Sequence, residues 1–369
     1  MDEQSDDIAT LLGESAAAFV AERYGARGLR LDIEEPQRVD RALWREMAGL
    51  GWLGLALPEP LGGLGMGMRE AAVLAEIMGR KVVPEPLVAA AMMPGVLLAR
   101  CDPAMELVRR LADAVSGGDS LVTIAWQEAA GEIEPDIPAT RLDGKHLTGR
   151  KCFVAAAEDD ALLLVSARDG DDAVLVAVEP AAPGVRVQRQ AGGLMSFATI
   201  RFDAAPILDG TVLLRGAAAD VALQCALEAG RVLLSAQLTG IAVGALEKTV
   251  TYVGERIQFE RPIGSFQSVQ HRCVDLHIAT MLAGAAWRYA QRTFDAAPLE
   301  PATQAAVSAA KARSGDAAMQ VCRSAVQLHG AMGFTEEGGV GIHLRAAMQL
   351  STWLGTTTAH RRRFFAAAA

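Results

Sequence analysis

The stretch that most constrains this chain is residues 254–271, which separates two long runs with helical periodicity. Apolar residues recur every three or four positions on either side of it, the spacing of one face of an amphipathic helix. Between the runs, Pro262 and Gly264 stop one helix and allow the chain to reverse. The pattern predicts two antiparallel helices joined by a tight turn. The apolar positions are Leu234, Leu238, Ile241 and Ala245 before the turn, and Val269, Cys273, Leu276, Thr280, Ala283 and Trp287 after it.

The turn itself carries charge and an aromatic ring, because Arg256 and Arg261 flank Phe259. A guanidinium group can pair with a pyrophosphate, and an aromatic face can pack against a flat ring. The turn therefore suits a ligand that contains phosphate, although an arginine at a helix end is also a common solvated cap.

Periodicity divides the rest of the chain into three parts. Helical spacing dominates up to about residue 115, alternation follows between about 119 and 213, and helical spacing returns from residue 217. We therefore expect an α+β fold with an N-terminal helical domain at residues 1–118, a middle antiparallel β-domain at 119–213 and a C-terminal four-helix bundle at 214–369. The expected strands are 121–126, 146–155, 161–168, 173–179, 185–190 and 197–203, and the expected bundle helices are 217–257, 266–294, 302–330 and 340–366.

Composition disfavours several classes of function. The net charge of −9 argues against nucleic acid as a partner. No apolar run reaches the length that spans a bilayer, and the acidic N-terminus is unlike a signal peptide, so we expect a cytoplasmic protein without membrane insertion. The five cysteines and six histidines show no metal-ligand spacing. We therefore expect no metal site, and buried free thiols at Cys101, Cys152, Cys225, Cys273 and Cys322.

Two segments carry a resemblance to a known family. Residues 256–271 read Arg-x-x-Phe-x-x-Pro-Ile-Gly-x-Phe-Gln-x-x-Gln-His, and residues 51–65 read Gly-Trp-Leu-Gly-Leu-Ala-Leu-Pro-Glu-Pro-Leu-Gly-Gly-Leu-Gly. Both strings resemble motifs of the acyl-CoA dehydrogenase family. The resemblance implies that family's fold, FAD as the cofactor, and an acyl-CoA substrate that is desaturated between its α and β carbons. It also implies an electron-transfer flavoprotein as the electron acceptor.

Five residues match positions that contact FAD in this family. They lie in the turn, in residues 327–334 and in residues 355–358. In the family, the first two of these segments reach largely into the FAD site of a neighbouring subunit. The glycines of the second segment are also compatible with a simple helix end. The matched residues are Arg256, Phe259, Gln327, Gly330 and Thr356.

The side of the site that holds the flavin ring departs from the family's pattern. Residues 124–131 lack the proline and the Gly-Ser-Asp turn of the matching family strand. Phe153 stands where the family has tryptophan, and Ala155 replaces a serine or threonine that donates a hydrogen bond to the flavin. The resemblance therefore implies that two polar contacts to the redox face are missing.

The family's catalytic base has no counterpart at either of its usual positions. Leu354 occupies the glutamate position before the last helix, and Gly230 occupies the alternative position in the first bundle helix. Desaturation needs a carboxylate over the α carbon, because a thioester α-proton is weakly acidic. Glu228 is a weak candidate, since helical geometry turns it roughly 200° from Gly230 and favours a surface or cap carboxylate. Arg231 matches an active-site arginine and is a candidate substrate contact, or else a helix-start arginine paired to Glu228 or the backbone.

These departures leave four interpretations. In the first, the chain is the base-lacking subunit of a heteromeric α2β2 acyl-CoA dehydrogenase and completes the FAD site of a paralogous catalytic subunit. Actinobacterial enzymes that degrade steroid side chains are similar to this arrangement. The others are a homomeric acyl-CoA dehydrogenase with an unrecognised base, a flavin-dependent monooxygenase on the same fold, and a structural or regulatory paralogue. We favour the first, because the retained residues are those that reach into a neighbour.

In the heteromeric interpretation, we expect the last two bundle helices to form much of an apolar subunit interface. An alanine-rich face there permits close approach of a partner helix, but it suits the core of the bundle equally well. This face contains Ala305, Ala306, Ala309 and Ala310.

Overall fold

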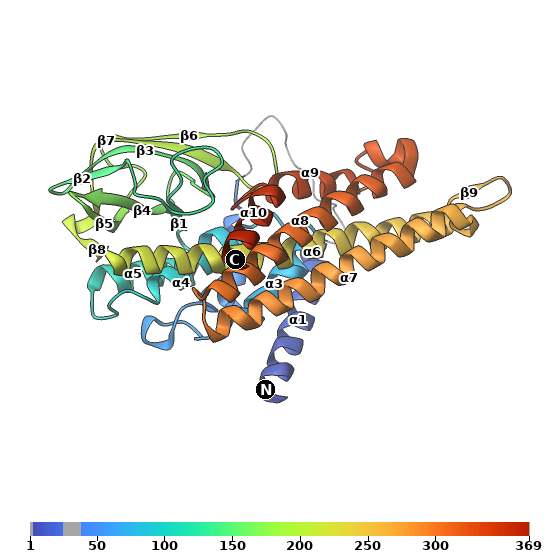
Figure 1. The fold of residues 1–369 in the computed structure, drawn as a ribbon, viewed down its shortest axis with the longest axis horizontal. Coiled ribbons are helices and arrows are strands. Elements are labelled where there is room, and N and C mark those ends of the chain that lie inside the picture. Colours follow the sequence, from blue (N-terminus) through green and yellow to red (C-terminus); the bar gives the residue numbers. More distant parts are fainter. Residues whose placement is uncertain (1–2, 25–37, 369) are drawn as a thin grey trace. The chain divides into compact units, whose positions relative to one another are not determined.

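The computed structural model describes residues 3–24 and 38–368 (Figure 1). The chain forms two compact units. The first, here called the helical unit, contains α1 (Glu3–Tyr24), α3 (Met68–Arg80) and the chain from Arg231 onward. The second, here called the sheet unit, contains the remaining described residues up to Gly230. The three domain boundaries expected from the sequence stay a prediction.

The sheet unit is built around an eight-stranded sheet with the order β6–β7–β3–β2–β4–β5–β8, and β1 pairs with β4. Most neighbouring strands are antiparallel, but β1 and β2 both run parallel to β4. The sheet is therefore mixed, and the prediction of a purely antiparallel domain is wrong in this respect. The strands are β1 (Val122–Ala125), β2 (Arg141–Asp143), β3 (His146–Ala155), β4 (Leu162–Asp169), β5 (Asp172–Val178), β6 (Val185–Arg189), β7 (Phe197–Pro206) and β8 (Val212–Arg215).

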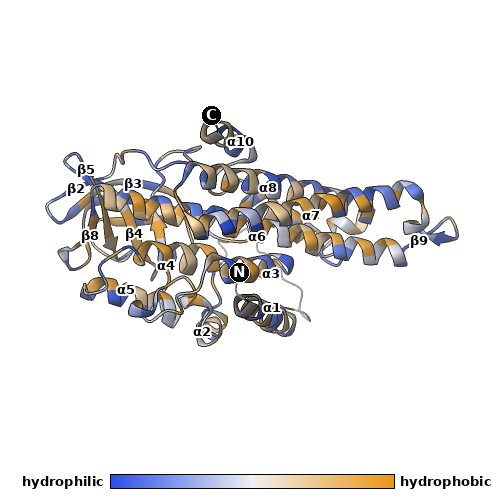
Figure 2. Ribbon diagram, turned by 60° about the horizontal axis from the view of Figure 1, so that its bottom comes forward, coloured by the Kyte–Doolittle hydropathy of each residue, from blue (hydrophilic) through white to orange (hydrophobic). Residues whose placement is uncertain are grey.

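Strand β7 confirms the alternating pattern that predicts it. Ala198, Ile200 and Phe202 are buried, whereas Arg201 and Asp203 are exposed. The buried side chains of β7 join those of β3, β4 and β5 in one apolar cluster. The sheet unit also contains helices α2 (Arg41–Gly49), α4 (Met93–Leu98) and α5 (Glu106–Gly117), and Figure 2 shows their hydrophobic residues.

The C-terminal part of the helical unit consists of long helices. Helix α6 (Ala217–Glu255), which belongs to the helical unit from Arg231 onward, runs into a hairpin of β9 (Ile257–Gln258) and β10 (Arg261–Pro262), as Figure 1 shows. Phe259 and Glu260 form its two-residue turn with φ of 52° and 65°, the conformation that matches the twist of a hairpin. The predicted reversal at this point is confirmed. The next helices are α7 (Gln267–Ala296) and α8 (Pro301–His329), which pack on each other.

The predicted helix at 340–366 is wrong, because the chain forms two shorter helices there. These are α9 (Gly341–Leu350) and α10 (Thr357–Ala368), and both pack on α8. The turn between them contains Leu354 with φ of 56° and Gly355 with φ of 114°. Both values are incompatible with a right-handed helix, so the helix ends before them.

Glycines allow α3 to lie close to α6 within the helical unit. A β-carbon added at Gly240 would lie 1.9 Å from the backbone oxygen of Glu76, and one at Gly244 would lie 2.0 Å from the backbone oxygen of Arg80. Any side chain at these positions would therefore force the two helices apart.

Helix α6 is long and apolar enough to cross a membrane, but 89% of its apolar window is buried within the protein. A mostly buried core helix can have the same length and apolar composition as a membrane-spanning helix. All five cysteines are free, and four of them are buried as expected. The prediction is wrong for Cys273, which is partly exposed. Within residues 3–24 and 38–368, no group of three or more acidic, histidine or cysteine side chains is arranged to hold a metal ion.

Candidate functional site

The ends of α6 and α8 meet at one end of the helical unit. The rings of Tyr252 and His329 stack with their centroids 4.2 Å apart, and the Tyr252 hydroxyl donates to the His329 carbonyl oxygen at 3.2 Å. The backbone N–H of Arg256 donates to the Tyr252 carbonyl oxygen at 2.8 Å. These contacts bring the hairpin close to Gln327 and Gly330, although about 70 residues separate the two segments. We call Arg256, Phe259, Gln327 and Gly330 the distal cluster.

The distal cluster points away from the chain. Arg256, Gln327 and Gly330 are exposed, and the Phe259 ring is 86% exposed. Arg261, by contrast, lies over the Phe266 ring at 4.1 Å and is held within its own chain. An exposed ring beside an exposed guanidinium group offers stacking and charge pairing to a molecule outside the chain.

Backbone geometry fixes the turn that follows α8. Gly330 has φ of 59° and ψ of −132°, a combination that favours glycine. A β-carbon at Gly333 would lie 2.5 Å from the Val326 backbone oxygen, and one at Gly338 would lie 2.0 Å from the Met332 backbone oxygen. The glycines therefore do more than end a helix, because they fold the chain tightly beside Gln327.

A second group of matched residues surrounds the turn between α9 and α10, here called the base turn (residues 351–356). Lys311 on α8 donates from Nζ to the carbonyl oxygens of Ser351 and Gly355, each at 3.0 Å. The His360 Nε2 lies 2.9 Å from the Leu354 carbonyl oxygen. The turn is thus held at its first residue and at Leu354 and Gly355 near its end. Leu354 is 3% exposed, and its side chain has no atom that accepts a proton.

The surroundings of the base turn are cationic. Arg231 and Lys311 are fully buried. Burial and, to a smaller extent, the Arg231 charge lower the pKa of Lys311 to about 7. Burial, with the charges of Lys311 and Arg231, lowers the pKa of His360 to about 2. Arg231 lies in the interior of α6, so the alternative of a helix-start arginine is wrong.

Thr356 lies with the base turn and not with the distal cluster. It is exposed at the start of α10, where its Oγ1 accepts from the Ala359 backbone N–H at 3.3 Å. The neighbouring Thr357 hydroxyl lies 3.0 Å from the position of a β-carbon at Gly315. Gly315 and Gln327 are twelve residues apart on α8, which corresponds to about 18 Å along the helix. The five matched residues therefore fall into two groups.

The two remaining candidates for the base lie in the interior of α6. Gly230 is buried and has no side chain. Glu228 is 2% exposed, so the expectation of a surface or cap carboxylate is wrong. It belongs to the sheet unit, whereas Leu354 belongs to the helical unit.

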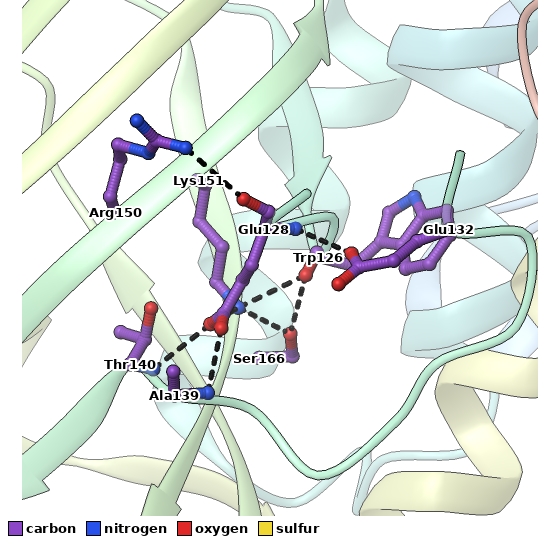
Figure 3. A network of polar contacts seen from close by, with 8 residues as sticks. All are labelled: Trp126, Glu128, Glu132, Ala139, Thr140, Arg150, Lys151 and Ser166. Carbon is purple, nitrogen blue, oxygen red and sulfur yellow. Dashed lines mark hydrogen bonds and ion pairs between the residues drawn. The ribbon is translucent and has the colours of Figure 1, made fainter. Parts of the chain in front are cut away.

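In the sheet unit, the segment that departs from the family's pattern contains a closed polar network (Figure 3). Lys151 Nζ, on β3, donates to Glu128 Oε1 at 2.7 Å, to the Trp126 carbonyl oxygen at 3.0 Å and to Ser166 Oγ at 3.0 Å. The Glu128 carboxylate also accepts from the backbone N–H groups of Ala139 and Thr140, at 2.6 and 2.9 Å. We call these groups the Lys151 network.

Electrostatics bind this network together. Burial acts to raise the pKa of Glu128, but the hydrogen bond and charge of Lys151 and the hydrogen bonds from Thr140 together outweigh it, so the net shift is downward. Burial lowers the pKa of Lys151 against the opposing influence of Glu128. Sequence reasoning missed this network. The available signal was a lysine inside a predicted strand, immediately before the apolar run at residues 152–157.

Strand β3 ends beside the network with an irregular register. Phe153 has φ of 52° at a bulge in the pairing with β7 and is 39% exposed. The carbonyl oxygen of Ala155 accepts from the Thr123 hydroxyl at 2.6 Å, and its methyl group offers no hydrogen bond. The strand is therefore formed at Phe153 and Ala155, but neither side chain offers a hydrogen bond.

Comparisons with known proteins agree with this organisation. The family model described as "Acyl-CoA dehydrogenase, N-terminal domain" matches residues 7–101, and "Acyl-CoA dehydrogenase, C-terminal domain" matches residues 219–368. The acyl-CoA dehydrogenase FadE27 of Mycobacterium tuberculosis is 30% identical over 342 residues, which cover 89% of this chain and 88% of that protein.

Two solved structures are similar over almost their whole length. A variant of the Tcur3481-Tcur3483 steroid ACAD is 29% identical, with a TM-score of 0.84 over 99% of this chain and 98% of that chain. The ChsE4-ChsE5 complex from Mycobacterium tuberculosis is 26% identical, with a TM-score of 0.83 over 99% and 97%. Together with the two family models, these similarities show that the chain belongs to the acyl-CoA dehydrogenase family.

Proposed function

We propose that this chain is the base-lacking subunit of a heteromeric, FAD-dependent acyl-CoA dehydrogenase and that it completes the FAD site of a catalytic partner subunit. The observation that carries the proposal is the contrast between two clusters. The distal cluster is intact and faces outward, whereas the base turn is firmly held but carries Leu354. A chain that keeps its outward contacts and lacks its own base is suited to serve a neighbour.

The distal cluster fits the phosphate and adenine half of FAD. Arg256 supplies a permanent positive charge, Phe259 supplies an exposed ring, and Gln327 supplies an exposed carboxamide. Gly330 leaves the backbone open to close approach, since a β-carbon there would meet nothing within 4 Å. These groups would hold the cofactor from one side, and the partner subunit would supply the other side.

The flavin-ring half fits less well in this chain. The Glu128 carboxylate is occupied by Lys151 and by two backbone N–H groups. Ala155 offers no side-chain donor to a ring oxygen or nitrogen. These observations support a division of labour in which the ring and the reacting carbons lie in the partner's site.

The chemistry of α,β-desaturation requires a proton acceptor at the α carbon, and bound FAD supplies the hydride acceptor in this family. Because leucine stands at the position of the base, the residues of this chain would bind and orient the cofactor and the substrate without taking up the proton. The proposed partner is a paralogous chain, in an α2β2 assembly, with a carboxylate at one of the two base positions. An electron-transfer flavoprotein is the proposed acceptor of the electrons.

The proposed substrate is an acyl-CoA with a steroid side chain as the acyl group. This proposal is supported by the Tcur3481-Tcur3483 steroid ACAD, which resembles the present chain along its full length. The ChsE4-ChsE5 complex is likewise similar and supports an assembly of two different chains. The buried Arg231 near the base turn is the residue we assign to the acyl-CoA side of the site.

The experiment that tests the proposal is the Arg256→Ala substitution in the co-expressed complex. Loss of a charge-assisted phosphate contact typically costs about 1.5–3 kcal/mol, so FAD should dissociate roughly tenfold to a hundredfold more readily. Flavin fluorescence during dilution measures the change. Arg141→Ala, at an exposed position on β2, is the matched control and should leave FAD binding unchanged. Equal FAD affinity in both variants would show that the distal cluster does not contact the cofactor.

A further inference from the structure

Three arginines stand side by side across the sheet unit, one on each of the neighbouring strands β3, β7 and β6 (Figure 1). Arg150 on β3 is the register partner of Arg201 on β7, which is in turn the partner of Arg186 on β6. Register partners carry their side chains on the same face of a sheet. All three arginines are exposed, whereas Ile200 and Phe202, on either side of Arg201, are buried on the opposite face. We call Arg150, Arg201 and Arg186 the arginine row.

The chain does not pair the arginine row with carboxylates. In the part of the chain that the structure describes, the guanidinium groups of Arg186 and Arg201 form no hydrogen bond or ion pair. The Arg150 guanidinium group donates to a backbone acceptor, the Glu128 carbonyl oxygen, at 3.4 Å (Figure 3). Several other arginines of the sheet unit do pair with carboxylates, namely Arg41, Arg45, Arg110, Arg189 and Arg215. The row therefore presents three positive charges to solvent, in a chain whose net charge is −9.

The arrangement of the row is unfavourable for the sheet itself. The Cβ atoms of register partners lie about 4.5–5.5 Å apart, and like charges directly opposite each other destabilise a sheet. On one side of the row, Gln188 and Thr199 are uncharged register partners. On the other side, Asp203 is the acidic residue of β7 and lies two residues from Arg201. One carboxylate does not balance three guanidinium groups, so the row indicates an anionic binding partner.

The alanine face of α8 does not offer a comparable surface. Ala306 and Ala310 are buried in the helical unit, Ala305 is half-buried and Ala309 is exposed. This face therefore packs mostly in the core of the bundle, which is the second of the two alternatives that the sequence left open.

The span of the arginine row indicates the shape of the anionic partner. Strands lie about 4.8 Å apart, so the three positions extend over about 10 Å across the sheet. On a helix, carboxylates at positions i, i+4 and i+7 share one face and extend over about 10.5 Å. On an extended strand, three carboxylates on one face extend over about 13 Å. An acidic helix therefore matches the row better than an acidic strand.

We propose that the arginine row is a docking site for an acidic helix of a partner protein, with one carboxylate at each guanidinium group. The planar guanidinium group matches a carboxylate through two parallel N–H donors. The contact is exposed and polar, so it is weak and is screened by salt. Charge complementarity of this kind contributes to the rate of association more than to affinity. The row therefore suits a partner that binds and leaves quickly.

The inference does not depend on the proposed function. The row belongs to the sheet unit, whereas Arg256 and Phe259 of the distal cluster belong to the helical unit. None of the three arginines matches a position that contacts FAD or supplies the base. The row can therefore bind a partner whether or not the distal cluster binds FAD.

The first test measures binding of a fluorescent helical peptide, with glutamates at i, i+4 and i+7, by anisotropy. Arg201→Ala should weaken binding about fivefold, the upper range for one exposed ion pair. Arg109→Ala removes an arginine of α5 whose side chain is 52% exposed, and it should leave binding unchanged. A peptide of the same composition, with its glutamates on three different sides of the helix, should bind more weakly. Equal binding of the two peptides, or equal loss in the two variants, would overturn the proposal.

Other occupants of the row give different results. Inorganic diphosphate that binds more tightly than the peptide, and depends on Arg201, would identify a phosphate-bearing ligand. A native mass that falls in Arg201→Ala would identify a second copy of this chain. Either result would overturn the assignment to an acidic helix. Arg256→Ala should leave peptide binding unchanged, so a loss of FAD in that variant tests the proposed function separately.

The second test asks whether the row is kept at the expense of stability. Arg201→Thr removes the central charge and retains a residue that favours strands. Its urea midpoint should be higher than that of the native chain at low salt, and the difference should shrink at about 1 M salt, where the Debye length is about 3 Å. Arg215→Thr on β8 loses an ion pair with Asp169 and should instead lower the midpoint. A lower midpoint for Arg201→Thr would show that Arg201 stabilises the sheet and would contradict the inference.

Discussion

At the scale of single residues, the base turn is held firmly although a leucine stands in it. Lys311 and His360 hold the base turn through three backbone carbonyl groups, and Leu354 keeps a φ of 56° that is costly for a leucine. These hydrogen bonds therefore hold the turn in a conformation that a leucine alone does not favour.

The buried Lys311 makes a prediction for stability. Its pKa is about 7 in the folded chain and near 10.5 when exposed, so the unfolded chain binds more protons between these values. Stability should therefore rise with pH through this window, by up to about 1.4 kcal/mol per pH unit. Urea unfolding measures this effect: between pH 7 and 8.5, the free energy of unfolding should rise less in Lys311→Met than in the native chain. The exposed Lys145→Met is the control, and parallel curves for all three would refute the assignment.

Residue roles that depend on a local motif could be predicted from the sequence. Roles that depend on contacts made by the fold could not. The sequence around Phe259 sufficed to predict a cationic, aromatic turn, and the family resemblance predicted that Arg256 and Phe259 reach outward. The pairing of Lys151 with Glu128 joins residues on different segments, and no periodic pattern records it. Glu228 shows the same limit, because its burial is set by neighbours that helical position alone does not reveal.

At the scale of elements, the sequence predicted those that are long or strictly alternating. The long helices and β7 were recovered because each presents a continuous apolar face. Strands β2 and β8 were missed, since three or four residues do not establish alternation. The break between α9 and α10 was missed because the base turn contains no proline and a single glycine, Gly355, to mark the end of a helix. Parallel pairing of β1 and β2 with β4 is a property of the sheet and leaves no local signal.

The approach of α3 to α6 gives a prediction at the same scale. Gly240→Ala would place a methyl group against the Glu76 backbone, where no flexible side chain can move aside. Overpacking of this kind costs about 1–3 kcal/mol, which should appear as a lower denaturant midpoint. Gly254→Ala on the same helix meets nothing within 4 Å and should be neutral or slightly stabilising. Equal midpoints for the two variants would show that the helices separate at no cost.

At the scale of the whole molecule, two parts of the surface expose side chains that proteins usually cover. The distal cluster exposes an aromatic ring and a guanidinium group, and helix α7 exposes Val274, Ile278, Met281, Leu282 and Tyr289 along about half of its length. Exposed groups of this kind are unfavourable in an isolated monomer and are typical of surfaces that are covered in a complex. The family resemblance predicted the first of these surfaces, whereas the second became visible when the fold divided α7 into its two faces.

The visible flavin spectrum and the native mass of the chain, purified alone and co-expressed with a paralogous subunit, distinguish a shared FAD site from a self-contained one. We expect a preparation with little flavin when the chain is alone. After co-expression, we expect a yellow mixed tetramer with FAD bound at the shared site. A full complement of FAD in a homo-oligomer of this chain would contradict the proposal of a shared site.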